Sequence, residues 1–452
     1  MGATRDSGSG EGQAAQAILS GPRALSGAAR AALEDFGRQH THSDAELFLS
    51  ASQRLTLEYE PGTRTSAASH GLAVSAAARV WAGERYGFAA GPVGATPDLR
   101  RLLELAQGRA AAGAAGASLP PPPVPAPAGP SPSGLPDLSV HAARQQAERL
   151  AREVVPPGVI VQALVLTWRA TESALLRSGG GETAQVEVGG EAFLRCETAR
   201  GAVVDAVALP PGEADADLAP LRARLAEAVS ALEGPAEAAD LTLPLVLRPA
   251  VAAPLVAGLS WLLQGDVAAA TPALARAVGR KVFPSVLSVD DDPVRPRGVS
   301  SRLFDDEGRT VRALRLVDEG RLLGFLHSGE TAARLGAEPN GRGLRDGAAP
   351  PAPSALGFFV VPRGDALPAH YMELVARVET FTTMPRPGRV CLIAGGWEVR
   401  DGQRVRRVAP VELDLPVLET FRALLGVGAD LTFFPTAGGC GAPSLLLPPR
   451  AS

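Results

Sequence analysis

FDDEGRTVRALRLVDEGRLLGFLHSGETAARLG, residues 304–336, is the stretch that decides the fold class of the second half of the chain. It holds two turn signals, DDEG at 305–308 and DEG at 318–320. Each places an Asp where its side chain closes a turn and a Gly where positive φ costs least. The stretch therefore predicts an antiparallel meander, and its last residues, ETAARLG at 330–336, predict a short helix.

The same kind of pattern continues toward the C-terminus. YMELVARVETFTTM at 371–384 and RVCLIAGGWEVRDGQRVRR at 389–407 predict strands, and RDGQ at 400–403 predicts a hairpin turn. PVLETFRALLGVGA at 416–429 predicts a helix. We expect a mostly antiparallel β domain with a few helices, either barrel-like or a meander.

The first half mixes strands with helices. Short alternating runs at 45–62 (AELFLSASQRLTLEYEPG) and 71–91 (GLAVSAAARVWAGERYGFAAG) predict strands. ATPDLRRLLELAQGRAAA at 95–112 predicts a helix, because its leucines recur on or near one helical face. The whole chain is therefore expected to be an α+β protein, with an N-terminal α/β domain followed by the C-terminal β-rich domain.

Shifts in composition divide the chain. Residues 1–42 are expected to form a flexible extension with a short helix, and residues 43–236 the N-terminal domain. Inside that domain the Pro-rich segment 113–139 predicts an exposed loop of polyproline character. Near residue 236 a helical pattern ends and a new strand pattern begins, so the C-terminal domain is expected over 237–452.

Composition excludes several classes of partner. The net charge is −4 and the pI is near 6.0, so the protein has no strong positive electrostatic field that would favour binding to nucleic acid or to an anionic membrane. No segment reaches about 18 uninterrupted apolar residues, as a membrane-spanning helix requires. The three cysteines form no C-x-x-C pair, which fits a reducing compartment. We expect a cytoplasmic protein, bacterial by its abundance of arginine and alanine, without nucleic-acid or membrane partners.

The residues alone indicate no catalytic set. Ser260 lies in GLSWL, which lacks the second glycine of a nucleophile elbow. The acidic clusters at 290–292 and 305–307 lack the alternating ligand spacing of a calcium loop, and turn chemistry explains them better. The six histidines include no pair at the helical spacing of a zinc peptidase.

Motifs in the second half resemble, in order, those of the TldD/PmbA family, bacterial and archaeal peptidases that work as paired subunits. The strand pair and small helix of 304–336 come first, and EPNGRGLR at 338–345 is similar to the family's N/T-G-x-x-R loop. A closing segment follows, with GGWEVRDGQ at 395–403 and APSLLL at 442–447. The first half agrees more loosely, so the resemblance covers about residues 43–447.

Catalytic members of this family carry H-E-x-x-x-H just before a G-D pair. Here QGD is kept at 264–266, but counting back from Asp266 the three motif positions hold Val256, Ala257 and Trp261. A catalytic zinc needs about three protein ligands and a nearby carboxylate, and these side chains offer neither. The family's further ligand is a cysteine in C-G-x-x-G-Q. Cys440 lies in GGCGAPS without that Gln and is only a weak metal candidate.

The resemblance therefore implies a subunit of the PmbA (TldE) type, without catalytic residues and without a cofactor of its own. It implies a heterodimer with a TldD-like catalytic subunit, which holds the zinc, and a short or unfolded peptide as substrate. Asn340, Arg342 and Arg345, in the polar loop PNGRGLRDG, are the candidate substrate-cleft residues, because arginine binds carboxylates and carbonyls well. The alternative is a stand-alone binding module, a homodimeric pseudo-enzyme that holds a peptide or small molecule without cleaving it.

Overall fold

The computed structural model describes residues 22–93, 96–113, 137–212, 216–293, 302–378, 388–435 and 439–450. The chain before residue 22 and most of the Pro-rich segment lie outside these ranges, so the loop predicted at 113–139 and the extension predicted at its start stay predictions. Among the described helices, none combines the length and the apolar composition that crossing a bilayer requires.

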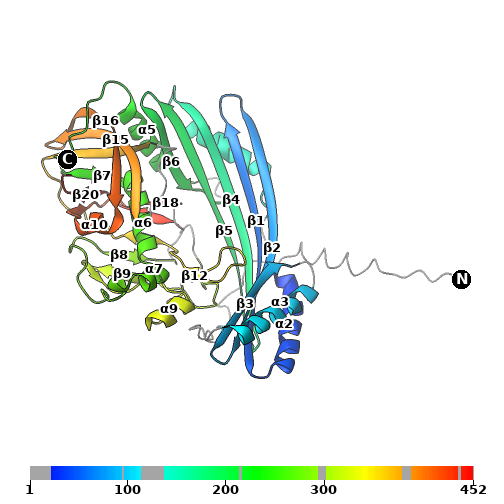
Figure 1. Ribbon diagram of the computed structural model, residues 1–452. Helices are drawn as coiled ribbons and strands as arrows, with labels where there is room; N and C mark the ends of the chain where they lie inside the picture. The colour runs from blue at the N-terminus through cyan, green and yellow to red at the C-terminus, as the bar shows by residue number, and fades with distance from the viewer. Residues whose placement is uncertain are drawn as a thin grey trace.

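The first half of the chain forms long strands backed by helices. Its strands are β1 (Ser43–Glu60), β2 (Thr65–Ala82), β3 (Arg85–Pro92), β4 (Ile160–Arg177), β5 (Glu182–Thr198) and β6 (Gly201–Ala208). Its helices are α2 (Pro22–Gln39), α3 (Thr96–Ala112), α4 (Val140–Glu153) and α5 (Ala219–Leu232). Figure 1 shows the long strands β1, β2, β4 and β5 running side by side along one flank of the molecule.

The second half is built from shorter elements. Its helices are α6 (Pro249–Leu262), α7 (Gly265–Ala270), α8 (Pro272–Ala275), α9 (Gly329–Leu335) and α10 (Val417–Arg422). Its strands are β7 (Leu245–Leu247), β8 (Val289–Asp291), β9 (Leu314–Asp318), β10 (Arg321–Leu322), β11 (Gly343–Leu344), β12 (Ala352–Pro353), β13 (Phe358–Val360), β14 (His370–Val378), β15 (Arg389–Arg400), β16 (Gln403–Pro416), β17 (Gly426–Val427), β18 (Thr432–Phe434), β19 (Cys440–Ala442) and β20 (Leu445–Leu447).

One large sheet runs through both halves. Its twelve strands lie in the order β17-β20-β7-β14-β6-β5-β4-β1-β2-β3, with β15 paired to β14 and β16 to β15. A second sheet has the order β10-β9-β8-β13-β19-β18. Neither sheet closes on itself, and the predicted α+β class with antiparallel-rich sheets is confirmed. The strands of the two halves of the chain meet in this sheet where Val378 of β14 pairs with Val203 of β6. The domain boundary near residue 236 stays a prediction.

The predicted hairpins form because their turn residues accept positive φ. Between β9 and β10 the two turn residues are Glu319 (φ 43°) and Gly320 (φ 80°). Between β15 and β16 they are Asp401 (φ 49°) and Gly402 (φ 76°). Positive φ at both central residues matches the right-handed twist of the flanking strands. The turns predicted at DEG and RDGQ are therefore confirmed.

The helix predicted over 416–429 is shorter than expected. It ends at Arg422. Gly426 and Val427 instead form β17 and pair with β20 at the edge of the large sheet. The helical periodicity of this stretch could not show that its last residues would pair with β20, which lies almost 20 residues further along the chain.

Alternation along β1 gives the large sheet an apolar face and a polar face. Leu47 and Leu49 are buried in a core shared with α2 and α3. Ser50, Ser52 and Arg54, at the alternate positions, line a cavity on the opposite face. Because successive side chains of a strand point to opposite faces, this pattern fixes which side of the sheet is covered by helices. The polar face is left to loops from the second half of the chain.

Candidate functional site

The positions that correspond to the zinc motif lie on α6, in the core of the second half. Val256 is completely buried within the main hydrophobic cluster, and Ala257 packs against that cluster. Trp261 is 42% exposed at the end of the helix. Gly258 lets this helix approach α10 closely, since a Cβ at that position would lie 2.9 Å from a methyl carbon of Val417. Val256 and Ala257 serve packing, and none of the three positions supplies a metal ligand or a carboxylate base.

Cys440, the weak metal candidate of the sequence, lies beside the same helix. Its Sγ is 3.6 Å from the carbonyl oxygen of Ala253 on α6. Burial raises the pKa of the Cys440 thiol well above its usual value, so the thiolate form that binds metals is disfavoured. Among the described residues, no group of three His, Cys, Asp or Glu side chains is placed to hold a metal ion. The residues around α6 therefore do not fit a zinc ion.

The acidic clusters have two different roles. Asp290 and Asp291 lie in strand β8, so the prediction that residues 290–292 form a turn is wrong. Asp305 does close a turn, because its Oδ1 accepts the backbone N–H groups of Glu307 (3.0 Å) and Arg309 (2.8 Å). The turn at Asp305 was predictable from local spacing, because it closes within five residues. The strand at Asp290 and Asp291 was not, because it depends on pairing with distant strands.

Two of the three predicted cleft residues are bound mainly to segments outside their loop and do not face a cleft. The Asn340 amide donates to the carbonyl of Phe325 (2.8 Å) and accepts the backbone N–H of His327 (2.9 Å). Arg342 is 0% exposed. Its guanidinium pairs with the Asp291 carboxylate and donates to the carbonyls of Asp291 (3.1 Å) and Arg312 (2.7 Å).

The buried Arg342 guanidinium also donates to the carbonyls of Asn340 (3.0 Å) and Gly341 (3.2 Å). Every nitrogen of this side chain is therefore used inside the protein, and none reaches a cleft. Arg342 holds the loop in shape, which differs from the substrate contact expected from the loop's polarity. Only Arg345, of the three residues, lines the cavity on the polar face of the sheet.

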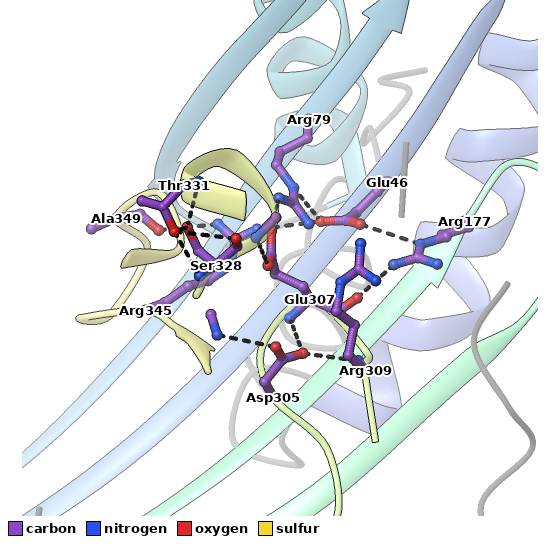
Figure 2. Close-up of polar contacts among 12 residues, drawn as sticks. Glu46, Arg79, Arg177, Asp305, Glu307, Arg309, Ser328, Thr331, Arg345 and Ala349 are labelled. Atoms are coloured by element: carbon purple, nitrogen blue, oxygen red, sulfur yellow. Dashed lines mark hydrogen bonds and ion pairs between the residues drawn. The ribbon is translucent and has the colours of Figure 1, made fainter. Parts of the chain in front are cut away.

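A buried ion network joins this loop to the large sheet (Figure 2). The Glu46 carboxylate on β1 accepts hydrogen bonds from Nε of Arg79 on β2 (2.6 Å) and from Nε of Arg177 on β4 (3.3 Å). Arg345 reaches the same carboxylate from its loop (3.3 Å). Arg79 also donates to Glu307 (2.8 Å). Charges from three strands and two loops thus meet at one point.

The arginines of the network stabilise the charged form of Glu46. Burial by itself would raise the pKa of Glu46, but the charges of Arg79, Arg345 and Arg177 outweigh it and hold that pKa below its usual value. Glu307 has a second role, because its other oxygen accepts the backbone N–H of Gly329 at the first turn of α9 (2.6 Å). The network therefore fixes the position of the loops that cover the polar face.

The cavity beside this network has a volume of about 590 Å³ and lies on the polar face of the sheet. Its floor is formed by alternate residues of β1 and β4. These residues are Phe48, Ser50, Ser52, Arg54, Arg169, Thr171 and Ser173. The rest of its lining comes from residues 71–73 on β2, from Glu187 on β5 and from the loops that carry Arg302, Asp306 and Arg345. Segments more than 100 residues apart in sequence therefore form a single cavity.

The loop side of the cavity is held by charge pairs and stacking. Arg302 pairs with Glu187 and with Asp306 (3.2 Å to the latter). The Arg345 guanidinium carbon lies 4.7 Å from the ring centre of Phe48, a cation–π distance. The residues that line the cavity include hydroxyls and charges but no histidine and no cysteine. The arrangement can hold a polar ligand, but it lacks a nucleophile with an adjacent base.

The buried network was missed at the level of sequence, although one signal was present. Glu46 and Arg79 are charged residues within the apolar runs AELFL (45–49) and AAARVW (76–81). Charged side chains are almost never fully buried unless they are paired, so such positions predict a partner. The identity of that partner could not be read from the sequence, because Glu307 follows Arg79 by 228 positions.

Comparison with known proteins gives the class of the second half. Residues 241–449 match the model of the PmbA/TldA metallopeptidase C-terminal domain. The chain is 27% identical over 217 residues to a metalloprotease of Synechocystis sp., a match that covers 44% of this chain and 47% of that protein. It is 29% identical over 179 residues to a metalloprotease of Methanothermobacter thermautotrophicus, covering 37% of each. These matches span less than half the length of the curated relatives.

Solved structures share the fold over nearly the whole chain. A Thermotoga maritima protein, described as a candidate modulator of a DNA gyrase, superposes with a TM-score of 0.75 at 17% identity. TldE from Thermococcus kodakarensis superposes with a TM-score of 0.73 at 17% identity. Each match covers 93% of this chain and 98% of the other chain. The family of the C-terminal domain is metallopeptidase-related. The findings support a TldD/PmbA-family protein, with residues 241–449 as its C-terminal domain.

Proposed function

We propose that this chain is the non-catalytic subunit of a TldD/TldE-like zinc metallopeptidase that processes short or unfolded peptides. In this proposal a TldD-like partner supplies the zinc and the catalytic base. This chain completes the substrate cleft with the polar face of its large sheet. The proposal joins the family membership of the chain to the chemistry of its own residues.

The observation that carries the proposal is the state of α6. Val256 is fully buried among apolar side chains, and Ala257 and Trp261 donate no metal ligand. Hydrolysis of a peptide bond by this family's chemistry therefore needs groups that this helix does not supply. A second chain that carries them is the simplest source.

The cavity beside Arg345 supports the second part of the proposal. Its floor is sheet, its wall is a set of paired charges, and its hydroxyls can donate to and accept from main-chain groups. Enclosing an extended chain between subunits restricts access to unfolded segments. In such an assembly the residues of this chain bind and orient the peptide and exclude water, while cleavage takes place on the partner.

The test is co-expression with the TldD-like subunit of the same organism, followed by size-exclusion chromatography and a zinc-dependent assay on an unstructured peptide. We expect a joint peak that cleaves the peptide, and no cleavage by this chain alone. A partner that cleaves equally well without this chain, or two chains that never associate, would refute the proposal. Peptide binding by the lone chain would then favour the stand-alone binding module.

A further inference from the structure

Two arginines face each other at one end of the polar cavity. Arg54 on β1 lies directly opposite Arg169 on β4 in the strand register, and both residues line the cavity. Both are exposed. Among the described residues, no carboxylate pairs with either guanidinium.

The juxtaposition of the two guanidinium groups is unfavourable by itself. Like charges directly opposite each other on neighbouring strands repel and destabilise the sheet. Two carboxylates of β5 lie equally near in register: Glu187 opposite Thr171 and Glu191 opposite Thr167, each two residues along β4 from Arg169. Of these two, Glu187 lines the cavity. Arg302 engages Glu187 instead. Arg54 and Arg169 therefore line the cavity without an ion pair to Glu187 or Asp306, the carboxylates that Arg302 engages.

The rungs of the sheet next to the arginine pair carry hydroxyls. Ser52 and Thr171 form the next rung and share a hydrogen bond of 3.1 Å. Ser50 and Ser173 form the rung after it. From Arg54 back to Phe48, the floor spans seven residues of β1, or about 20 Å at the rise of a β-strand. That length suits an extended peptide of about six residues.

We propose that Arg54 and Arg169 bind a carboxylate of a peptide, whose main chain lies along the hydroxyl-lined floor toward Phe48. The inference rests on the proposed function in taking a peptide as the ligand. Two guanidinium groups can hold one carboxylate with parallel charge-assisted hydrogen bonds, and the added negative charge relieves their mutual repulsion. The carboxylate is either the C-terminus of the peptide or an Asp or Glu side chain.

The test measures peptide binding to the full chain by fluorescence anisotropy, without the partner subunit. The probes are the fluorescein-labelled hexapeptide Gly-Ser-Ala-Gly-Ser-Ala with a free C-terminal carboxylate, its C-terminal amide, and two amidated hexapeptides that carry an internal Glu or an internal Gln. The variant is the double substitution Arg54→Gln and Arg169→Gln. The matched control is Arg222→Gln, which removes an exposed arginine from α5.

We expect the double variant to weaken binding of the carboxylate-bearing peptide by about ten- to a hundredfold, the usual effect of losing hydrogen bonds to a charged group. Arg222→Gln should bind as the unaltered chain does. The double variant should unfold at the same temperature as the unaltered chain or higher, because the cross-strand repulsion is gone. A residue pair with a purely structural role would lower that temperature instead.

The peptide pairs identify the source of the carboxylate. Loss of binding on C-terminal amidation indicates the terminus, and loss on replacing the internal Glu by Gln indicates a side chain. The inference is overturned if the double variant binds every peptide as the unaltered chain does, or if the unaltered chain binds none of them at millimolar concentration. Association of the unaltered chain with the TldD-like subunit is measured separately, so failure to associate, with peptide binding intact, would refute the proposed function alone.

Discussion

Replacing Arg342 by methionine removes a guanidinium that is completely buried and leaves a side chain of similar length. The substitution deprives the Asp291 carboxylate of its charged partner, while the backbone N–H groups of Leu356 (3.0 Å) and Gly357 (2.7 Å) remain as donors. It also leaves four backbone carbonyls without the donors that Arg342 supplied. Breaking a buried ion pair on one side costs about 3–5 kcal/mol, because the other charge stays buried.

The neighbouring strand offers a matched control. Arg315 pairs with Asp290, one residue before Asp291, with an Nη2 to Oδ2 distance of 3.2 Å, but the arginine side chain is 42% exposed. An exposed pair contributes about 0–1 kcal/mol, so Arg315→Met should lower the free energy of unfolding far less than Arg342→Met. Urea denaturation followed by circular dichroism measures both variants.

The result also separates the two roles considered for Arg342. A structural role predicts a large loss of stability and faster proteolysis within the loop at 338–349. A loss of stability no larger than that of Arg315→Met would refute the reasoning, because it would mean that the guanidinium is not buried against Asp291 in solution. Such a result would return Arg342 to the candidate substrate contacts.

Three further outcomes follow from the same structure. Cys440 should resist a water-soluble thiol reagent until the chain is unfolded, because it is buried and its thiol pKa is raised; rapid labelling of the folded protein at that residue would contradict this. Glu46→Gln should destabilise the protein by about 3–5 kcal/mol at pH 7. The folded pKa of Glu46 lies below its usual 4.5, so its contribution is present above that value and is lost as the pH falls through the folded pKa; unfolding curves whose separation does not shrink in acid would argue against a charged Glu46. Replacing residues 113–137 by a short Gly/Ser linker should leave soluble expression and the unfolding temperature unchanged, and insoluble protein would show that the segment packs.

Local signals in the sequence predicted the elements whose formation depends on neighbouring residues. The hairpins at DEG and RDGQ form where Asp or Glu and Gly accept positive φ, and the alternation in β1 gives its two faces. The class of fold follows from these elements together. They required no knowledge of distant segments, which is why the sequence was sufficient for them.

The site depended on distant pairings that no local pattern reveals. Loop polarity made Arg342 look like a ligand-binding residue, but its partner Asp291 lies 51 positions earlier and buries it. For Arg345 the prediction from loop polarity agrees better with the structure, because this side chain lies beside Glu46 and Phe48 of β1 and lines the cavity. Arg54 and Arg169 were passed over for a related reason, because their opposition becomes visible only in the register of β1 and β4.

The central claim, that this chain lacks its own catalytic metal site, is tested most directly by elemental analysis of zinc. The protein is purified alone, and then as a complex with the TldD-like subunit. The account predicts no stoichiometric zinc in the chain alone and one zinc per complex, held by the partner. One tightly held zinc per molecule of the chain alone would contradict it, and Cys440 beside α6 would then be the first ligand to test.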